Sequence, residues 1–167
     1  MLQPIFYPLP RVKRENHGEI RGTIESGYTI GTISKNTAFG VFGKLTDTTR
    51  NLPIAAKSEM EVAFRNEIKQ GKATILCELA NGKTEEYEIE IQKVFLNNDH
   101  DNKSMLIKIT DEKLLQKTGG IIQGMSGAPI IQNDKFVGAV THVLVGDPTM
   151  GYGVFADIML KQMKMSN

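Results

Sequence analysis

The feature that most constrains the fold of this chain is a series of short β-branched and aromatic runs separated by glycine or polar turn residues. Runs of this composition are typical of β-strands. Many short strands between glycine turns indicate an all-β barrel or sandwich. The pattern predicts strands near Glu19–Ile24, Thr29–Ser34, Phe39–Lys44, Ala73–Leu79, Glu85–Val94, Met105–Ile109, Pro129–Gln132, Phe136–Val145 and Gly151–Phe155.

Two hairpins can be placed within this pattern. In the stretch TILCELANGKTEEYEIEIQKV, the dipeptide Asn81-Gly82 suits a type I′ turn, which requires positive φ at both central residues. Tyr87 and the isoleucines after it alternate with glutamates, so one face of that strand should be buried and the other exposed to solvent. A second pairing is expected where apolar residues flank the polar segment Gln132–Lys135.

Helical patterns are sparse. Asp111–Lys117 begins with an N-cap residue type and is followed by a pair of glycines, which predicts a short helix. The C-terminal stretch FADIMLKQMKM has apolar residues near helical spacing and predicts a second short helix packed on the barrel. The segment Ser58–Lys69 fits either a strand or a helix, and the strand is slightly favoured.

Length and charge narrow the class of protein. The chain has 167 residues, which suits one domain, and its formal charge of +1 argues against a nucleic-acid partner, which usually requires a basic surplus. Its single cysteine rules out an internal disulfide and a thiolate zinc cluster. The N-terminal stretch MLQPIFYPLPRVKR contains three prolines and no continuous apolar run, so it does not resemble a signal peptide.

The segment with the clearest chemical meaning is Gly124-Met125-Ser126-Gly127-Ala128-Pro129. A nucleophilic serine must present its hydroxyl from a tight turn, with backbone N–H groups converging on the developing oxyanion. Glycine at 124 permits a positive φ, and Gly127 leaves room for the attacked carbonyl. The sequence therefore makes Ser126 a candidate nucleophile and the amides of Gly124, Met125 and Ser126 candidate oxyanion donors. A purely structural glycine–serine turn before a strand is the alternative.

The motif and its surroundings resemble a known family. The stretches IRGTI, FGVFGKL and IKITDEKLLQKTGGIIQGMSGAPIIQNDKFVGAVTHVLVGDPTMGYGVFADIML are similar to the SpoIVB (S55) family of chymotrypsin-like serine peptidases. The resemblance runs from about Gly18 to Leu160 and is strongest from Ile107 onward. It implies a mainly β fold of chymotrypsin-like barrels, with the second barrel complete, the first truncated, and a short C-terminal helix.

The same resemblance implies a domain organisation and site residues. Residues 1–167 would form one S55 domain lacking its N-terminal part, with 1–95 as a remnant of the first barrel and linking strands, and 96–167 as the nucleophile-bearing barrel segment. Ser126 falls on the family's nucleophile and Asp111 on its proposed acid. Asp111 also suits a plain helix N-cap, and that alternative is the stronger from the residues alone. A substrate cleft is expected at Gly120, Gln123, Thr141, His142 and Val143.

The general base is missing from the matched region. In the family the base belongs to a Gly-His segment early in the first barrel, and no such segment is present here, so it is expected upstream of Met1. His17 and His100 lie in polar, loop-like stretches and are expected at the surface. His142, in the strand after Ser126, is expected to be an ordinary strand histidine, with a substitute base as the alternative. An isolated fragment of this kind would react slowly.

By resemblance, the intact protein would be a sporulation signalling protease of a Gram-positive bacterium. It would act outside the cytoplasm, between forespore and mother cell, and would cleave a membrane-associated regulator to trigger processing of a sigma-factor precursor. The membrane anchor would lie outside this chain, no cofactor is expected, and an open barrel edge would favour a homodimer by strand exchange.

Two other classes remain open. One is a catalytically inactive β-barrel that binds peptides while Ser126 is idle. The other is a metal or nucleotide enzyme, but the Asp99–Asp101 segment lacks convergent ligand spacing and no phosphate-binding loop is present.

Overall fold

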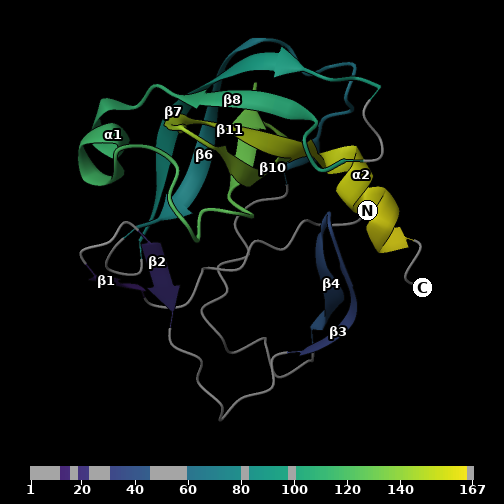
Figure 1. The fold of residues 1–167 in the computed structure, drawn as a ribbon. Coiled ribbons are helices and arrows are strands. Elements are labelled where there is room, and N and C mark those ends of the chain that lie inside the picture. The colour runs from purple at the N-terminus through teal and green to yellow at the C-terminus, as the bar shows by residue number, and fades with distance from the viewer. Residues whose placement is uncertain are drawn as a thin grey trace.

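The structure is a computed structural model, and it describes residues 12–15, 19–22, 31–45, 60–79, 83–97 and 101–164. The elements are β1 (Val12–Glu15), β2 (Glu19–Gly22), β3 (Gly31–Thr37), β4 (Gly40–Leu45), β5 (Glu61–Val62), β6 (Gly71–Glu78), β7 (Thr84–Val94), β8 (Met105–Ile109), α1 (Glu112–Thr118), β9 (Pro129–Gln132), β10 (Lys135–Leu144), β11 (Asp147–Phe155) and α2 (Ala156–Lys164). The described part of the chain is therefore mainly β and contains two short helices, as predicted (Figure 1).

Six strands close into an antiparallel barrel. The sheet runs in the order β11-β8-β7-β6-β9-β10, and a further pairing of β10 with β11 joins the two ends. The short strand β5 adds to β10 in parallel at Lys135 and Phe136. Closure removes the free edges that an open sheet of this size would present.

The barrel forms because its strands alternate between apolar and polar residues. In β7, Tyr87, Ile89 and Ile91 are buried while the glutamates between them face outward, as the sequence predicted. β6 pairs with β7 along the full length of β6, from Gly71 opposite Ile91 to Glu78 opposite Thr84. The buried side chains form one main core inside the barrel. The Asn81-Gly82 turn expected between these strands lies outside the described residues.

The β9–β10 hairpin turns at Asn133 and Asp134, which have φ values of 52° and 59°. Positive φ at two successive residues is the signature of a type I′ turn, and asparagine and aspartate adopt it more readily than most residues. The predicted pairing around Gln132–Lys135 is therefore confirmed. It brings the end of the Ser126 segment directly into the barrel wall.

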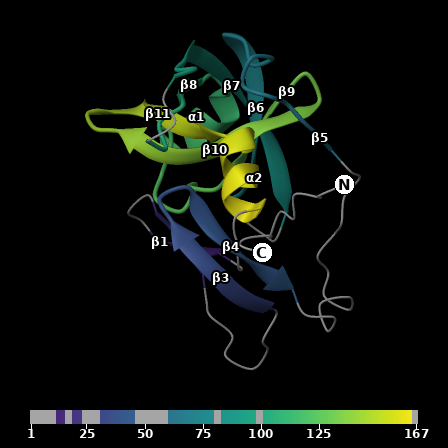
Figure 2. The same cartoon turned by 90° about the vertical axis from the view of Figure 1, so that its right-hand side faces the viewer.

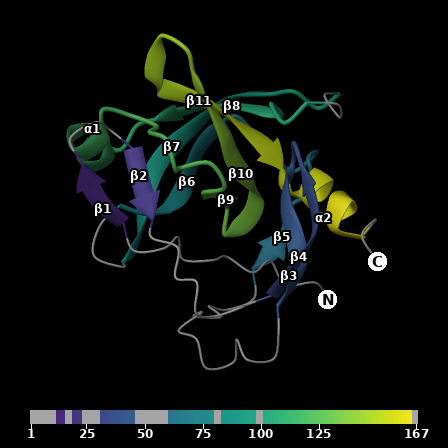
Figure 3. The ribbon, with the colours of Figure 1, turned by 60° about the horizontal axis from the view of Figure 1, so that its bottom comes forward.

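Two smaller sheets precede the barrel. β1 pairs with β2, and β3 pairs with β4. The β3–β4 hairpin lies beside the barrel near α2 (Figures 1 and 2), where Lys35 Nζ donates to Gln162 Oε1 at 2.9 Å. Phe39, in the turn of this hairpin, packs against the main core. Figure 3 shows the same hairpin alongside α2 from below.

The predicted division of the chain near residue 95 falls between β7 and β8, two paired strands of the closed barrel. β6 and β7 belong to the same closed barrel as β8 to β11, so residues 96–167 do not form a barrel without them. The reason is pairing: β6 contacts β9, and β7 contacts β8, so the wall closes only when both are present. The sequence also missed β1, and the described part of Ser58–Lys69, from Met60 onward, holds the two-residue strand β5. None of the described helices is long and apolar enough to cross a membrane.

Candidate active site

The loop that carries Ser126 starts where α1 ends. Gly119 caps the helix in the left-handed conformation, with φ of 74°, and its N–H donates to the carbonyl of Leu115. Gly120 follows, buried, with φ of 142°. A Cβ at Gly120 would lie 2.2 Å from the Pro148 carbonyl oxygen, so only glycine lets the loop approach β11 this closely. The Ile121 N–H donates to the same carbonyl at 2.7 Å.

A buried methionine anchors the tip of the loop. Met125 is 1% exposed, and its N–H donates to the Ile122 carbonyl at 3.1 Å. The Met125 carbonyl accepts from the Ala128 N–H at 3.0 Å. Gly124 and Gly127 have φ of 97° and 93°, which closes the turn on either side of the serine. The Met125 side chain therefore points into the core while its neighbour Ser126 is exposed.

The tip of the loop is also fixed to β10. The Gly127 N–H donates to the Val140 carbonyl at 2.7 Å, and the Val140 N–H donates to the Ala128 carbonyl at 2.9 Å. These two bonds continue the β9–β10 ladder beyond Pro129. Ser126 is thus held at a defined position above the barrel wall by backbone bonds on its C-terminal side.

The Ser126 hydroxyl donates to the backbone carbonyl of Thr141 at 2.9 Å. Among the described residues, no turn or loop hydrogen bond uses the amide of Gly124 or of Ser126. An oxyanion pocket requires N–H donors of this kind, and the role of these two amides in such a pocket stays a prediction. The Met125 amide is engaged by Ile122 in this conformation, so it is not available for that role.

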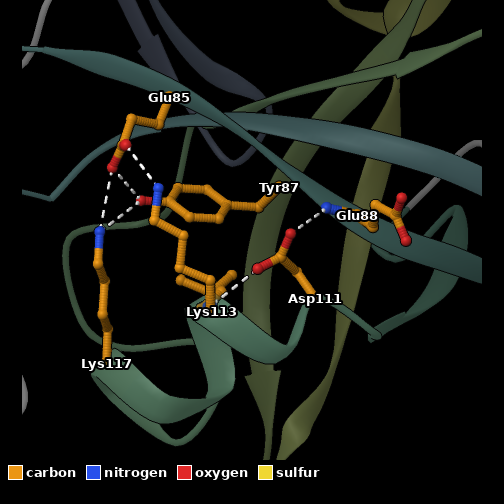
Figure 4. Close-up of polar contacts among 7 residues, drawn as sticks. Glu85, Tyr87, Glu88, Asp111, Lys113 and Lys117 are labelled. Atoms are coloured by element: carbon orange, nitrogen blue, oxygen red, sulfur yellow. Dashed lines mark hydrogen bonds and ion pairs between the residues drawn. The ribbon is translucent and has the colours of Figure 1, made fainter.

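Asp111 has a structural role. Its Oδ1 accepts from the Leu114 N–H at 2.8 Å, which makes it the N-cap of α1, and its Oδ2 accepts from the Glu88 N–H at 3.2 Å (Figure 4). Both carboxylate oxygens are therefore engaged by backbone amides, which is the N-cap alternative expected from the sequence. No hydrogen bond links Asp111 to a histidine in the part of the chain that the structure describes. A role for Asp111 as a catalytic acid stays a prediction.

A cluster of charged and aromatic residues beside Asp111 was not predicted. Glu85 accepts from Lys113 Nζ at 2.8 Å and Lys117 Nζ at 3.1 Å, and its Oε2 accepts from the Tyr87 hydroxyl at 2.7 Å (Figure 4). The hydrogen bond from Lys113 is the main reason that the pKa of Glu85 falls to about 2. Burial, reinforced by Glu85, raises the pKa of Tyr87. The spacing of the two lysines, four residues apart on α1, indicates that they share one face of the helix. It does not predict their partner, because Glu85 lies on β7.

The predicted cleft residues separate into exposed and buried ones. Gln123, His142 and Val143 are exposed, and Val143 is 42% exposed. Gly120 is instead buried against Pro148, so it positions the loop and does not present a surface to substrate. The remaining predicted cleft residue is Thr141, whose hydroxyl points to the Asn102 carbonyl.

Within the described residues, no histidine is hydrogen-bonded to Ser126, and the cysteine is buried. His142 is the single histidine among them, and no hydrogen bond connects it to Ser126; His17 and His100 lie outside this part of the chain. Cys77 is buried, and burial raises the pKa of its thiol to about 12, so it is no thiolate nucleophile. The described residues also contain no cluster of three or more histidine, cysteine, aspartate or glutamate side chains placed to hold a metal ion.

Comparison with solved structures identifies the fold. The active form of the Rv3671c protease from M. tuberculosis matches with a TM-score of 0.53 and 15% identity, over 80% of this chain and 57% of that one. An inactive serine-to-alanine mutant of the same protein matches with a TM-score of 0.51 and 15% identity, over 81% and 63%. This chain therefore spans less than two thirds of either. The barrel is of the chymotrypsin-like protease type.

The family is shown by sequence. Residues 5–160 match the family described as SpoIVB peptidase S55, so the chain belongs to this family of serine peptidases. A search of curated protein sequences returned no match. The predicted family and the mainly β, chymotrypsin-like fold are confirmed.

Proposed function

We propose that this chain is a serine endopeptidase domain whose nucleophile is Ser126. The observation that carries the proposal is the Ser126 residue, exposed in a hydrogen-bonded turn in which no turn or loop bond among the described residues uses the amides of Gly124 and Ser126. Membership of the SpoIVB peptidase S55 family supports the same assignment.

The geometry suits acyl transfer. The Ser126 hydroxyl would attack a peptide carbonyl, and the resulting oxyanion would accept hydrogen bonds from the N–H groups of Gly124 and Ser126. A base takes the hydroxyl proton and returns it to the leaving amine, and water then hydrolyses the acyl-enzyme. An extended peptide would lie along Gln123, His142 and Val143, which are exposed around the serine loop.

We propose that the general base of this reaction lies outside the described residues. His142 makes no hydrogen bond to Ser126, and the Thr141 carbonyl that does accept from the hydroxyl is no base at neutral pH. The family pattern favours a histidine from a Gly-His segment that this sequence does not contain. A domain without its base retains only oxyanion stabilisation and binding, worth about 10³–10⁴ over water.

The biological role that we propose follows the family. The protease would act in spore formation, outside the cytoplasm between forespore and mother cell, on a membrane-associated regulator of sigma-factor processing. Only the family description supports this part of the proposal.

A fluorophosphonate probe tests the nucleophile. Labelling should be confined to Ser126, should be lost in Ser126→Ala, and should be kept in Ser34→Ala, which removes an exposed hydroxyl from β3. The adduct is located by peptide mass spectrometry. Absence of labelling above the Ser126→Ala background would overturn the proposal, whereas labelling at the rate of a complete serine protease would show that a base is already present. His142→Ala then decides whether that base is His142.

A peptide-binding domain without catalysis is the second candidate. It is favoured by one observation, that the Ser126 hydroxyl donates to the Thr141 carbonyl and is hydrogen-bonded to no described histidine. It predicts measurable affinity for extended peptides, by calorimetry, without any acylation of Ser126.

A further inference from the structure

Thr141 occupies an irregular position in the barrel wall. In the β10–β11 ladder, Val140 pairs with Gly153 and His142 pairs with Tyr152, so Thr141 is an extra residue with no partner on β11. Such a β-bulge redirects the backbone of the bulged residue, and bulges are common beside active sites. Here the Thr141 carbonyl turns to the serine loop and accepts from Ser126 Oγ at 2.9 Å.

The side chain of Thr141 is anchored on the opposite side of the bulge. Its hydroxyl lies 2.8 Å from the Asn102 carbonyl and 3.2 Å from the Tyr152 carbonyl, and its single proton can serve either acceptor. Because valine has the same shape without the hydroxyl, the anchor can be removed with little change in packing. Thr141 therefore connects the Ser126 hydroxyl to the segment before β8.

This connection continues to the β3–β4 hairpin. Asn102 Nδ2 donates to the Ala38 carbonyl in the hairpin turn at 2.8 Å. The neighbouring Phe39 packs on the barrel core. A chain of hydrogen bonds thus runs from Ala38 through Asn102 and Thr141 to Ser126, between elements that Figure 2 shows on the same side of the barrel.

The hydrogen bond from the Ser126 hydroxyl to the Thr141 carbonyl bears directly on reactivity. A serine hydroxyl must give its proton to a base before or during attack, and an amide carbonyl accepts a hydrogen bond without accepting the proton. We infer that Thr141 is a positioning residue that holds Ser126 in a resting orientation, and that this bond must open before the hydroxyl can react. The inference rests on the proposed role of Ser126 as the nucleophile.

Thr141→Val tests the inference directly. Without its anchor the bulge can relax, the carbonyl can leave Ser126, and fluorophosphonate labelling should accelerate about threefold to tenfold, in line with the loss of one modest hydrogen bond. Thr141→Ser keeps the hydroxyl and should restore the slow rate. Thr149→Val is the matched control, because that hydroxyl bonds Asp147 in the same hairpin and does not contact Thr141. Unchanged or slower labelling of Thr141→Val would overturn the inference.

Thermal unfolding gives a second readout that needs no activity. If Ser126 and Thr141 act through one hydrogen bond, the fall in Tm for the Ser126→Ala, Thr141→Val double variant should be smaller than the sum of the two single falls. Asn102→Ala removes the hydrogen bond from Asn102 Nδ2 to the Ala38 carbonyl and keeps the Asn102 carbonyl that Thr141 bonds. It should accelerate labelling less than Thr141→Val. Additive falls in Tm contradict the inference even if Ser126 is the nucleophile. If the falls in Tm are coupled but no variant is labelled by the fluorophosphonate, the hydrogen bond between Ser126 and Thr141 is supported and the proposed function is contradicted.

Discussion

At the scale of single residues, the most consequential positions are those that hold the serine loop and its flanking helix. Asp111 caps α1 and binds the Glu88 amide of β7. Gly120 lets the loop approach Pro148. Neither residue needs to touch substrate to matter, because each fixes one end of the segment that leads to Ser126.

Replacing Asp111 by alanine should lower the free energy of unfolding by about 1–2 kcal/mol, since it removes an N-cap and leaves the Leu114 and Glu88 amides without their acceptor. Asp111→Asn retains a cap oxygen and should recover most of this loss. Both values come from denaturant titration. Full stability of Asp111→Ala would contradict the structural role, whereas a stable Asp111→Asn with greatly slowed labelling of Ser126 would favour the predicted catalytic acid.

Gly120→Ala should be strongly destabilising, because the new Cβ meets the Pro148 carbonyl in a backbone conformation that already disfavours a side chain. Gly71→Ala is the matched control, with a similar positive φ of 121° and open space around the Cβ position. The loss in free energy of unfolding at Gly120 should exceed that at Gly71 by about 1–3 kcal/mol. Equal losses would show that the close contact relaxes easily.

At the scale of elements, α1 is fixed to β7 by Glu85, which lies between Lys113 and Lys117 of the helix (Figure 4). The exposed position of these pairs means that salt screens them and that their contribution is modest. Their pH dependence is nevertheless specific, because the pKa of Glu85 is held at about 2, well below the ordinary value of 4.5.

A carboxylate whose pKa is lower in the folded protein stabilises the fold above its unfolded pKa and loses that effect as it is protonated. The contribution of Glu85 should therefore be complete above pH 4.5 and fall between pH 4.5 and 2. Glu85→Gln should flatten the dependence of Tm on pH in that window and leave the rest of the profile unchanged. Parallel profiles for the two proteins would contradict the assignment, and high salt should reduce the difference.

At the scale of the whole molecule, several contacts hold the segment before β6 on the barrel, and one of them is made by a buried polar side chain, Gln132. Gln132, 6% exposed, accepts from the Lys69 N–H at 3.0 Å and donates to the carbonyls of Lys69 and Lys72 at 2.9 and 3.1 Å. Arg65 adds an ion pair with Asp157 of α2 at 2.8 Å. These contacts join distant parts of the chain into one unit.

Gln132→Ala should cost about 2–3 kcal/mol of unfolding free energy, because three backbone groups lose their partner inside the protein. Gln92→Ala removes a half-buried glutamine whose side chain, among the described residues, donates to the Glu90 carboxylate, and should cost less than about 0.5 kcal/mol. Denaturant titration gives both values, and limited proteolysis should cut Gln132→Ala first within residues 60–70. Similar losses for the two variants would contradict this role of Gln132.

Local patterns were sufficient for much of this protein. The alternation of β7, the N-cap at Asp111, the pairing around Gln132–Lys135 and the Gly-rich serine motif each depend on residues close together in the chain, so period and turn chemistry predict them. The family follows from the same motif and its neighbours. The strands that make up the barrel could not be predicted in this way, because barrel closure depends on pairing between strands far apart in sequence, such as β6 with β9.

The site shows the same division. The sequence alone determined that Ser126 is presented between flexible glycines, since backbone freedom is a property of individual residues. Only the tertiary structure decided that its hydroxyl meets the Thr141 carbonyl, that Gly120 is buried beneath Pro148, and that both Asp111 oxygens are engaged by backbone amides. Those outcomes depend on the bulge in β10 and on the packing of loops from opposite sides of a closed barrel, and no local pattern in the chain encodes either.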